Sequence, residues 1–300
     1  MSRDVLATHP RLRLAIYRTG TAVARTCPLW AGRLLAWLAG TLAWAFDPRG
    51  RAVVRRNLAH FIPAACRDAR ERAVRRSYVA FCCYLFESFR LDRLPPWFFG
   101  PDRLRHFDPC GVFAKGAARG PAILVTVHCN WELASAALNR LGWLDQVQVV
   151  VLPSGDPRID AIFERQRNAV GARSLSLDRA PLGTLRALRA GGTIGLVGDR
   201  DYRGTGMTVP FAGEPMTIPI GPAALAVQTG APIIPVLLAR RGLTHFDLLI
   251  GRPLRANPEV AKGPEVERLT TELAGALARF IAAAPAQWVA FHPAWKTGRS

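Results

Sequence analysis

The pattern of hydrophobic and polar positions changes near residue 121, where short apolar runs begin to alternate with amphipathic stretches. Short apolar runs bounded by turn residues predict buried strands, and apolar positions three and four apart predict helices. The predicted strands are Ala122–Val127, Val147–Leu152, Ser174–Leu177, Thr193–Val197, Ile233–Ala239, Phe246–Ile250 and Trp288–Phe291. The predicted helices are Glu132–Leu141, Ile159–Val170, Pro181–Arg189, Pro222–Thr229 and Pro264–Ala284. This alternation predicts an α/β fold with a mixed, largely parallel central sheet flanked by helices.

The amino-terminal part is patterned differently, and we predict that residues 12–46 are helical. The uninterrupted apolar run Leu34–Phe46 has 13 residues, fewer than the roughly 20 that span a bilayer. Trp30, Trp37 and Trp44 recur every seven residues, which would place them on one stripe of a helix. Because Trp favours the membrane interface, we predict a membrane-associating segment, with a core helix of the domain as the alternative.

Residues 51–90 are predicted to form two further helices, the second of them over Ala69–Phe89. The predicted organisation is therefore a basic, Trp-bearing, membrane-associating helical segment at residues 1–50 and one α/β domain at residues 51–300.

The charge balance is strongly basic, with a formal net charge of +18, and only three of the 40 basic residues are Lys. Arg is the better bidentate donor to phosphate groups. Three interpretations remain open at this point: nucleic-acid binding, attraction to an anionic membrane, and a solvated Arg-rich surface. The six cysteines have no C-x-x-C spacing, which favours free thiols in a reducing compartment, buried as small hydrophobic side chains.

The candidate chemistry begins where the strand Ala122–Val127 ends, at His128. Asn130 is a favourable helix N-cap, and Glu132 lies in the first turn of the following helix, four residues after the histidine. A neutral histidine can take the proton of an attacking hydroxyl, and a carboxylate on its other nitrogen can fix its tautomer. Such a pair alone is a weak signal, because His128 could bond a loop carbonyl while Glu132 only caps the helix.

Other chemistries lack their motifs in the sequence. Gly195-x-x-Gly198 has no following Lys-Ser/Thr and is no phosphate loop. No Gly-x-Ser-x-Gly nucleophile elbow occurs. No metal motif is found, and the Arg neighbours of Asp199 and Asp201 argue against a metal there. We expect no cofactor.

Several segments resemble a known family. The first, residues 120–134, is a buried strand followed by His128-Cys129-Asn130-Trp131-Glu132, and a second block runs from Gly198-Asp199-Arg200-Asp201-Tyr202-Arg203 through residues 204–236. Arg55-Arg56-Asn57-Leu58 and the closing segment Gln287–Lys296 are also similar. The chain thus resembles the lipid A biosynthesis lauroyl/myristoyl acyltransferases, within the lysophospholipid acyltransferase superfamily. That family has four residues between its His and its acid, and this chain has three.

The resemblance implies an acyl thioester donor, carried by acyl carrier protein or CoA, and a hydroxyl of a lipid A precursor or related glycolipid as acceptor. His128 would be the general base and Glu132 the residue that orients it. The substrate site would be lined by Asn130, Asp199, Arg200, Asp201 and Arg203. The two Arg would donate hydrogen bonds to a phosphate group, and the alternative is an internal ion-pair cluster of these charged residues.

The implied partners are the thioester carrier, the lipid acceptor and an anionic membrane, at the cytoplasmic face of a bacterial inner membrane, with a peripheral attachment or a single amino-terminal anchor. Nucleic acid is not expected as a partner, since the Trp pattern and the acyltransferase segments explain the basic charge better. Two alternatives remain: an acyltransferase for another polar lipid such as a phosphoinositide mannoside, and a catalytically weak lipid-binding homologue, suggested by the shortened His–Glu spacing.

Overall fold

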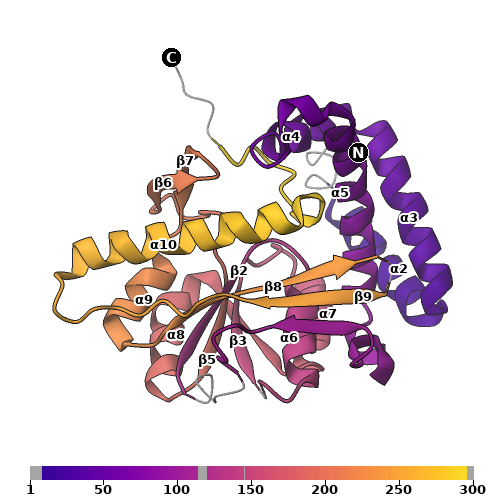
Figure 1. Ribbon diagram of the computed structural model, residues 1–300. Helices are drawn as coiled ribbons and strands as arrows, with labels where there is room; N and C mark the ends of the chain where they lie inside the picture. Colours follow the sequence, from indigo (N-terminus) through magenta and orange to yellow (C-terminus); the bar gives the residue numbers. More distant parts are fainter. Residues whose placement is uncertain (1–8, 114–119, 145, 243, 296–300) are drawn as a thin grey trace.

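The computed structural model describes residues 9–113, 120–144, 146–242 and 244–295, so that Lys296 of the closing segment lies outside it. Within these residues the strands form a seven-stranded sheet in the order β1-β9-β8-β2-β5-β3-β4 and a separate hairpin (Figure 1). The sheet strands are β1 (Leu104–Phe107), β2 (Ala122–Thr126), β3 (Val147–Val151), β4 (Ala172–Ser176), β5 (Thr193–Val197), β8 (Ile233–Arg241) and β9 (His245–Ile250). Within the seven-stranded sheet of the described residues, β8 and β9 pair antiparallel and the other neighbouring strands pair in parallel, which confirms the predicted mixed, largely parallel sheet.

The helices that cover the sheet form two layers. One face packs against α6 (Trp131–Arg140), and the other packs against α9 (Gly221–Thr229) and the long α10 (Lys262–Ala283), which lies along the sheet in Figure 1. Strand β2 divides its side chains between the layers: Leu124 belongs to the first core, and Ile123 and Val125 to the second. Helices α7 (Pro157–Asn168) and α8 (Ala180–Arg189) flank the β3–β4–β5 half of the sheet.

The amino-terminal helices stand beside this domain and pack on one another (Figure 1). They are α2 (Pro10–Thr26), α3 (Leu29–Phe46), α4 (Pro48–Leu58) and α5 (Arg67–Ser88). Short 3₁₀ turns occupy Ala64–Cys66, Leu91–Arg93, Pro96–Phe99, Leu177–Arg179 and Pro285–Gln287. The predicted helix over residues 12–46 is interrupted at Cys27-Pro28, because proline lacks a donor and forces the residue before it into an extended conformation.

The prediction of a strand at Trp288–Phe291 is wrong. This segment is irregular, and the Val289 N–H donates to the His128 carbonyl at 2.8 Å, so the chain passes the end of β2 and does not extend the sheet. Two features were not predicted: the edge strand β1 and the antiparallel hairpin of β6 (Met207–Phe211) and β7 (Glu214–Ile218).

Helix α3 packs on α5 through its small residues. A Cβ at Gly40 would lie 2.6 Å from the Val79 Cα, so only glycine allows this close approach. The Arg33 guanidinium of α3 donates twice to the buried Glu87 carboxylate of α5, at 3.0 and 3.1 Å, and Arg240 of β8 pairs with the same carboxylate. Breaking these ion pairs would leave a buried charge without a partner, which is costly, so they hold α3 against the sheet domain.

The outer face of α3 is apolar and exposed. Among the described residues α3 is one helix that is long and apolar enough to cross a membrane, by length and composition only, with 22% of its residues buried. Trp30 is 73% exposed and Trp37 is 43% exposed, but Trp44 is half-buried, with the Arg51 and Arg75 guanidinium groups over its ring. The three Trp residues therefore do not share one environment.

Candidate active site

His128 and Asp199 meet beyond the carboxyl ends of β2 and β5, because these two central strands are neighbours. Strands β2 and β5 pair in parallel with Thr126 opposite Val197, and each candidate residue lies two positions beyond its strand. The His128 Nδ1 lies 2.7 Å from the Asp199 Oδ1. Gly198 is required at the turn, since a Cβ there would lie 2.6 Å from a Val125 methyl group.

The Asp199 carboxylate is 2% exposed and is held by further donors. The His128 backbone N–H lies 3.2 Å from both carboxylate oxygens, and the Trp288 indole Nε1–H donates at 2.6 Å. Burial by itself would raise the pKa of Asp199, but the His128 ring and these hydrogen bonds hold its pKa below the usual value. Asp199 is therefore ionised and can accept the Nδ1–H of His128.

The closing segment of the chain completes this arrangement. Trp288 supplies the indole donor to Asp199, and Val289 bonds the His128 carbonyl. Asn57, in the Arg-Arg-Asn-Leu segment of α4, donates to the carbonyls of Ala290 and His292 at 2.8 Å each. Two segments singled out by resemblance, far apart in sequence, thus hold each other beside the site.

The second ring nitrogen of His128 points to a tyrosine. The Tyr202 Oη lies 3.3 Å from the His128 Nε2, and the Arg200 guanidinium lies over the Tyr202 ring, 4.4 Å from its centroid. In the neutral imidazole whose Nδ1–H is directed to Asp199, Nε2 carries the lone pair that a general base needs. The His128 side chain is 23% exposed, so the ring can be reached from solvent.

The expectation that Glu132 orients His128 is corrected by this geometry. Glu132 is 3% exposed and its Oε1 accepts from the Arg167 Nη2 of α7 at 3.2 Å. The first turn of α6 directs Glu132 into the interior between α6 and α7, so the orienting contact falls to Asp199. The carboxylate in contact with the His128 ring belongs to Asp199 and not to Glu132. The shortened spacing between His128 and Glu132 therefore does not determine this contact.

The other predicted site residues have structural contacts. Asn130 is the N-cap residue of α6, with a left-handed φ of 47°, but its side chain does not cap the helix. Its amide donates to the Leu238 carbonyl and to Gln287. Asp201 accepts three backbone N–H groups at 2.7 to 3.1 Å, which shapes the turn after β5. Asn130, Asp199 and Asp201 therefore hold the backbone and side chains around the site in place, and their contact with substrate stays a prediction.

Arg200 and Arg203 lie on the exposed side of the same turn. The Arg203 guanidinium donates to the Leu177 carbonyl, and Arg200 stacks on Tyr202. Arg200 thus lies beside the tyrosine that contacts His128, and Arg203 reaches the end of β4. The contact of either residue with a phosphate stays a prediction.

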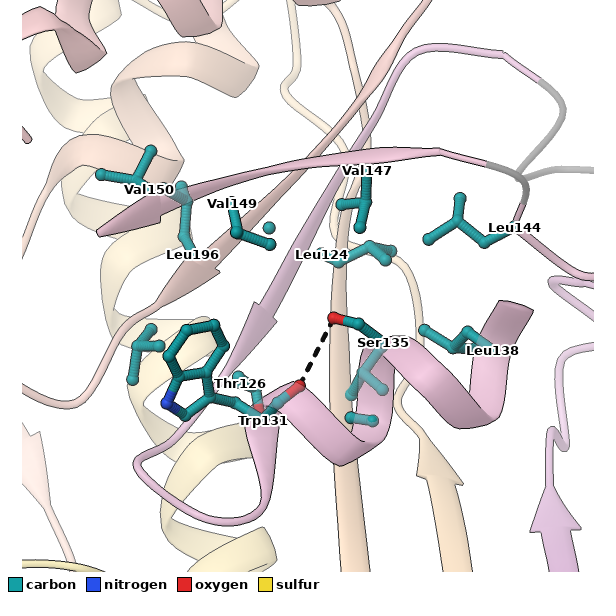
Figure 2. Close-up of a pocket in the computed structure, with 14 residues that line it drawn as sticks. Leu124, Thr126, Trp131, Ser135, Leu138, Leu144, Val147, Val149, Val150 and Leu196 are labelled. Carbon is teal, nitrogen blue, oxygen red and sulfur yellow. Dashed lines mark hydrogen bonds between the residues drawn. The ribbon is translucent and has the colours of Figure 1, made fainter. Parts of the chain in front are cut away.

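An apolar cavity of about 40 Å³ begins beside the site. It lies between α6 and the strands β2, β3 and β5, and Figure 2 shows Trp131 and Thr126 at one end and Leu138 and Leu144 at the other. Thr126 and Trp131 flank the turn that carries His128.

Cys129 is disfavoured as a nucleophile at this site. Burial raises the pKa of its thiol to about 12, so that it is protonated at neutral pH. Among the described residues no group of three His, Cys, Asp or Glu side chains is placed to hold a metal. The contact between His128 and the buried Asp199 carboxylate is an arrangement that can activate a hydroxyl.

The buried Glu132 predicts a specific pH dependence of stability. Burial raises its pKa from 4.5 to about 7, although Arg167 opposes this. Between these pH values the folded protein retains a proton that the unfolded chain has lost, so this group makes stability fall as the pH rises. Relative to Glu132→Gln, wild type is expected to lose about 3 kcal/mol of unfolding free energy from pH 4.5 to 7.5. Urea denaturation at several pH values measures this difference, and parallel pH profiles would contradict it.

A mixed α/β fold with a histidine–carboxylate pair at the strand ends is an arrangement that suits an enzyme transferring a group to or from a hydroxyl. Comparison with known protein families identifies the family to which this enzyme belongs. The chain matches the family described as bacterial lipid A biosynthesis acyltransferase over residues 4–297, and it therefore belongs to that family and is an acyltransferase. This confirms the family resemblance of the sequence motifs.

Its relatives include phosphatidylinositol mannoside acyltransferases. The protein from Mycolicibacterium smegmatis is 30% identical over 253 residues, which cover 82% of this chain and 80% of that protein. The protein from Mycobacterium tuberculosis H37Rv is 30% identical over 307 residues, covering 94% and 91%. The 1-acyl-sn-glycerophosphate acyltransferase of Thermotoga maritima aligns at 16% identity over 82% of this chain and 96% of that structure, and its TM-score of 0.40 adds nothing to the assignment.

Proposed function

We propose that the protein moves an acyl chain from a thioester to a hydroxyl of a membrane glycolipid, with His128 as general base and Asp199 as the residue that orients it. The observation that carries this proposal is the 2.7 Å contact between the His128 Nδ1 and the buried Asp199 carboxylate. It leaves the opposite nitrogen, Nε2, as a base at the rim of the site.

The reaction follows from this arrangement. The Nε2 lone pair takes the hydroxyl proton as the acceptor oxygen attacks the thioester carbonyl carbon. Asp199 stabilises the imidazolium that forms, as the carboxylate of a serine-protease triad does. When the carbon–sulfur bond breaks, the imidazolium returns the proton to the leaving thiolate. The acceptor hydroxyl takes the part of a nucleophilic side chain, so no covalent enzyme intermediate is needed.

Two features support an acyl thioester donor. The small cavity that begins at Thr126 and Trp131 is lined by apolar side chains of α6 and the sheet, a surface that suits hydrocarbon. Arg200 and Arg203 lie at the rim, where the phosphate of a phosphopantetheine arm on acyl carrier protein or CoA would pass. The net charge of +18 favours acidic donors and acidic lipids alike.

Two acceptors follow from different observations. The family match favours a lipid A precursor, and the relatives that are 30% identical favour a phosphatidylinositol mannoside. Both present sugar hydroxyls on an anionic lipid, so the same base and the same basic surface serve either.

The decisive experiment supplies purified protein with acyl-CoA or acyl carrier protein thioester and, in parallel, a lipid A precursor, a phosphatidylinositol mannoside and a lysophospholipid. We expect acylated product with a glycolipid and release of an equal amount of thiol. Binding of lipid without turnover for any acceptor would instead support the catalytically weak lipid-binding homologue.

We further propose that α2 and α3 attach the protein to the cytoplasmic face of an inner membrane. Their exposed apolar side chains are Leu12, Ile16, Val23, Trp30, Leu34, Leu35, Trp37, Leu38, Leu42 and Phe46. This surface lies on helices that also carry Arg, a composition suited to an anionic leaflet. Arg33 attaches α3 to Glu87 of α5, and Arg240 of β8 pairs with the same carboxylate, which favours an interfacial position for α3.

Charged substitutions on this surface should weaken membrane binding. The double variant Leu34→Glu and Leu42→Glu is expected to bind anionic vesicles at least about 100-fold more weakly, since each Leu transfer contributes roughly 1.5 to 3 kcal/mol. Co-sedimentation with phosphatidylglycerol-containing vesicles measures the affinity. Leu182→Glu is the matched control, because Leu182 of α8 is 66% exposed but lies on another part of the molecule. Equal losses in both proteins would refute the assigned surface.

A further inference from the structure

The Tyr202 hydroxyl occupies the place that an acceptor hydroxyl needs. In the neutral tautomer that directs its Nδ1–H to Asp199, the Nε2 of His128 is an acceptor, and the Tyr202 Oη, 3.3 Å away, is placed to donate to it. A lipid hydroxyl about to lose its proton must make this same hydrogen bond. Tyrosine and acceptor therefore compete for one lone pair.

The surroundings of Tyr202 allow it to leave. The side chain is 42% exposed, and the Arg200 guanidinium covers one face of the ring at 4.4 Å. The turn beneath it is shaped by Asp201, which accepts the N–H groups of Arg203, Gly204 and Gly206. Because Asp201 holds the backbone of the turn independently of the ring, the Tyr202 side chain can change rotamer without a change in the turn, and exposed rotamers interconvert rapidly.

An uncovered base would cause a side reaction. Water could give its proton to Nε2 while its oxygen bonds to the thioester carbonyl carbon. The carbon–sulfur bond would then break, the thiolate would take the proton from the imidazolium, and the acyl chain would be lost as free fatty acid. A transferase that meets its donor before its acceptor must suppress this hydrolysis.

We propose that Tyr202 is a specificity residue that covers the Nε2 of His128 and excludes water until a lipid hydroxyl displaces it. This inference rests on the proposed function of His128, and it gives a role to Tyr202, a residue that lies in one of the resembling segments but to which neither the sequence motifs nor the comparisons assign a role. The energy involved is that of one hydrogen bond, about 1 kcal/mol, which a bound lipid can replace with its own hydroxyl.

The test compares hydrolysis with transfer in Tyr202→Phe, which keeps the ring and its contact with Arg200. Thiol release from acyl-CoA without acceptor should rise about three- to tenfold over wild type, since about 1 kcal/mol of protection is removed. Acceptor-dependent transfer should stay within about threefold of wild type, so the ratio of hydrolysis to transfer increases. A merely structural role for Tyr202 would lower both rates and leave that ratio unchanged.

The controls separate this inference from the proposed function. The double variant Tyr202→Phe with His128→Ala should show only background thiol release, which proves that the extra hydrolysis uses His128. Tyr84→Phe, which removes a hydroxyl from a core tyrosine of α5, should leave the ratio unchanged. The hydrolysis assay needs no acceptor, so it reads the role of Tyr202 even if no glycolipid is acylated.

Three results would overturn the inference. The first is thiol release by Tyr202→Phe that is no higher than that of wild type. The second is a loss of transfer in Tyr202→Phe as large as that in His128→Ala, which would make the hydroxyl itself catalytic. The third is a peptide mass showing an acyl group on Tyr202, which would make it a covalent carrier.

Discussion

Purified His128→Ala protein is expected to transfer acyl groups about 10²- to 10⁴-fold more slowly than wild type, which is the contribution of a well-placed general base. Without Nε2 the acceptor hydroxyl would have to attack while still protonated. The loss should appear in kcat, because the histidine assists the transition state and contributes little to substrate binding. Radiolabelled acyl transfer from acyl-CoA or acyl carrier protein to glycolipid measures the effect.

The fold must be shown to survive this substitution. His128 is 23% exposed and its backbone contacts to Asp199 and Val289 do not use the ring, so circular dichroism and thermal melting should be close to those of wild type. A folded His128→Ala protein that transfers acyl groups at the wild-type rate would end the catalytic assignment.

Asp199→Asn is expected to lower kcat by about 10³- to 10⁴-fold, as the same exchange does in serine proteases. The neutral amide no longer stabilises the imidazolium. It can also turn its NH₂ group towards Nδ1 and select the tautomer in which Nε2 carries the proton and cannot act as a base. The carboxylate bridges His128 and Trp288, so a change in the near-ultraviolet tryptophan signal should accompany the loss.

Glu132→Gln is the matched comparison for Asp199→Asn. Both exchanges neutralise a buried carboxylate near the turn that carries His128, but Glu132 bonds Arg167 and Asp199 bonds the histidine. We expect Glu132→Gln to retain activity within about tenfold of wild type, the effect of a lost positioning contact of roughly 1.4 kcal/mol. If Glu132→Gln lost as much activity as His128→Ala while Asp199→Asn did not, the roles given to the two acids would have to be exchanged.

Hydrophobic periodicity predicted the core of the fold well and its edges poorly. The runs that became β2 and the buried part of β8 are continuous and apolar because both faces of these strands are covered. Strand β1 was missed because it is short and mostly exposed, and the β6–β7 hairpin because it lies outside the main sheet. Trp288–Phe291 resembled a strand for a different reason: Trp288 and Ala290 are buried against the site and the neighbouring core.

The site was predicted in part. His128 was found because a histidine directly after a buried strand lies at the edge where parallel sheets place their chemistry. Asp199 was named, but as a substrate contact. A signal for its actual position was present in the sequence, since His128 and Asp199 follow their strands by the same number of residues. Nothing in the sequence indicated that those two strands are neighbours.

The sequence by itself determined the class of fold, the family, and the turn on which the base lies, because these depend on local periodicity and on motifs read along the chain. Only the tertiary structure decided which acid serves His128, what faces its other nitrogen, and which residues are committed elsewhere. Strand order brings β5 beside β2, and α7 brings Arg167 to Glu132. Such pairings are settled by packing between segments distant in sequence, where spacing along the chain gives no guide.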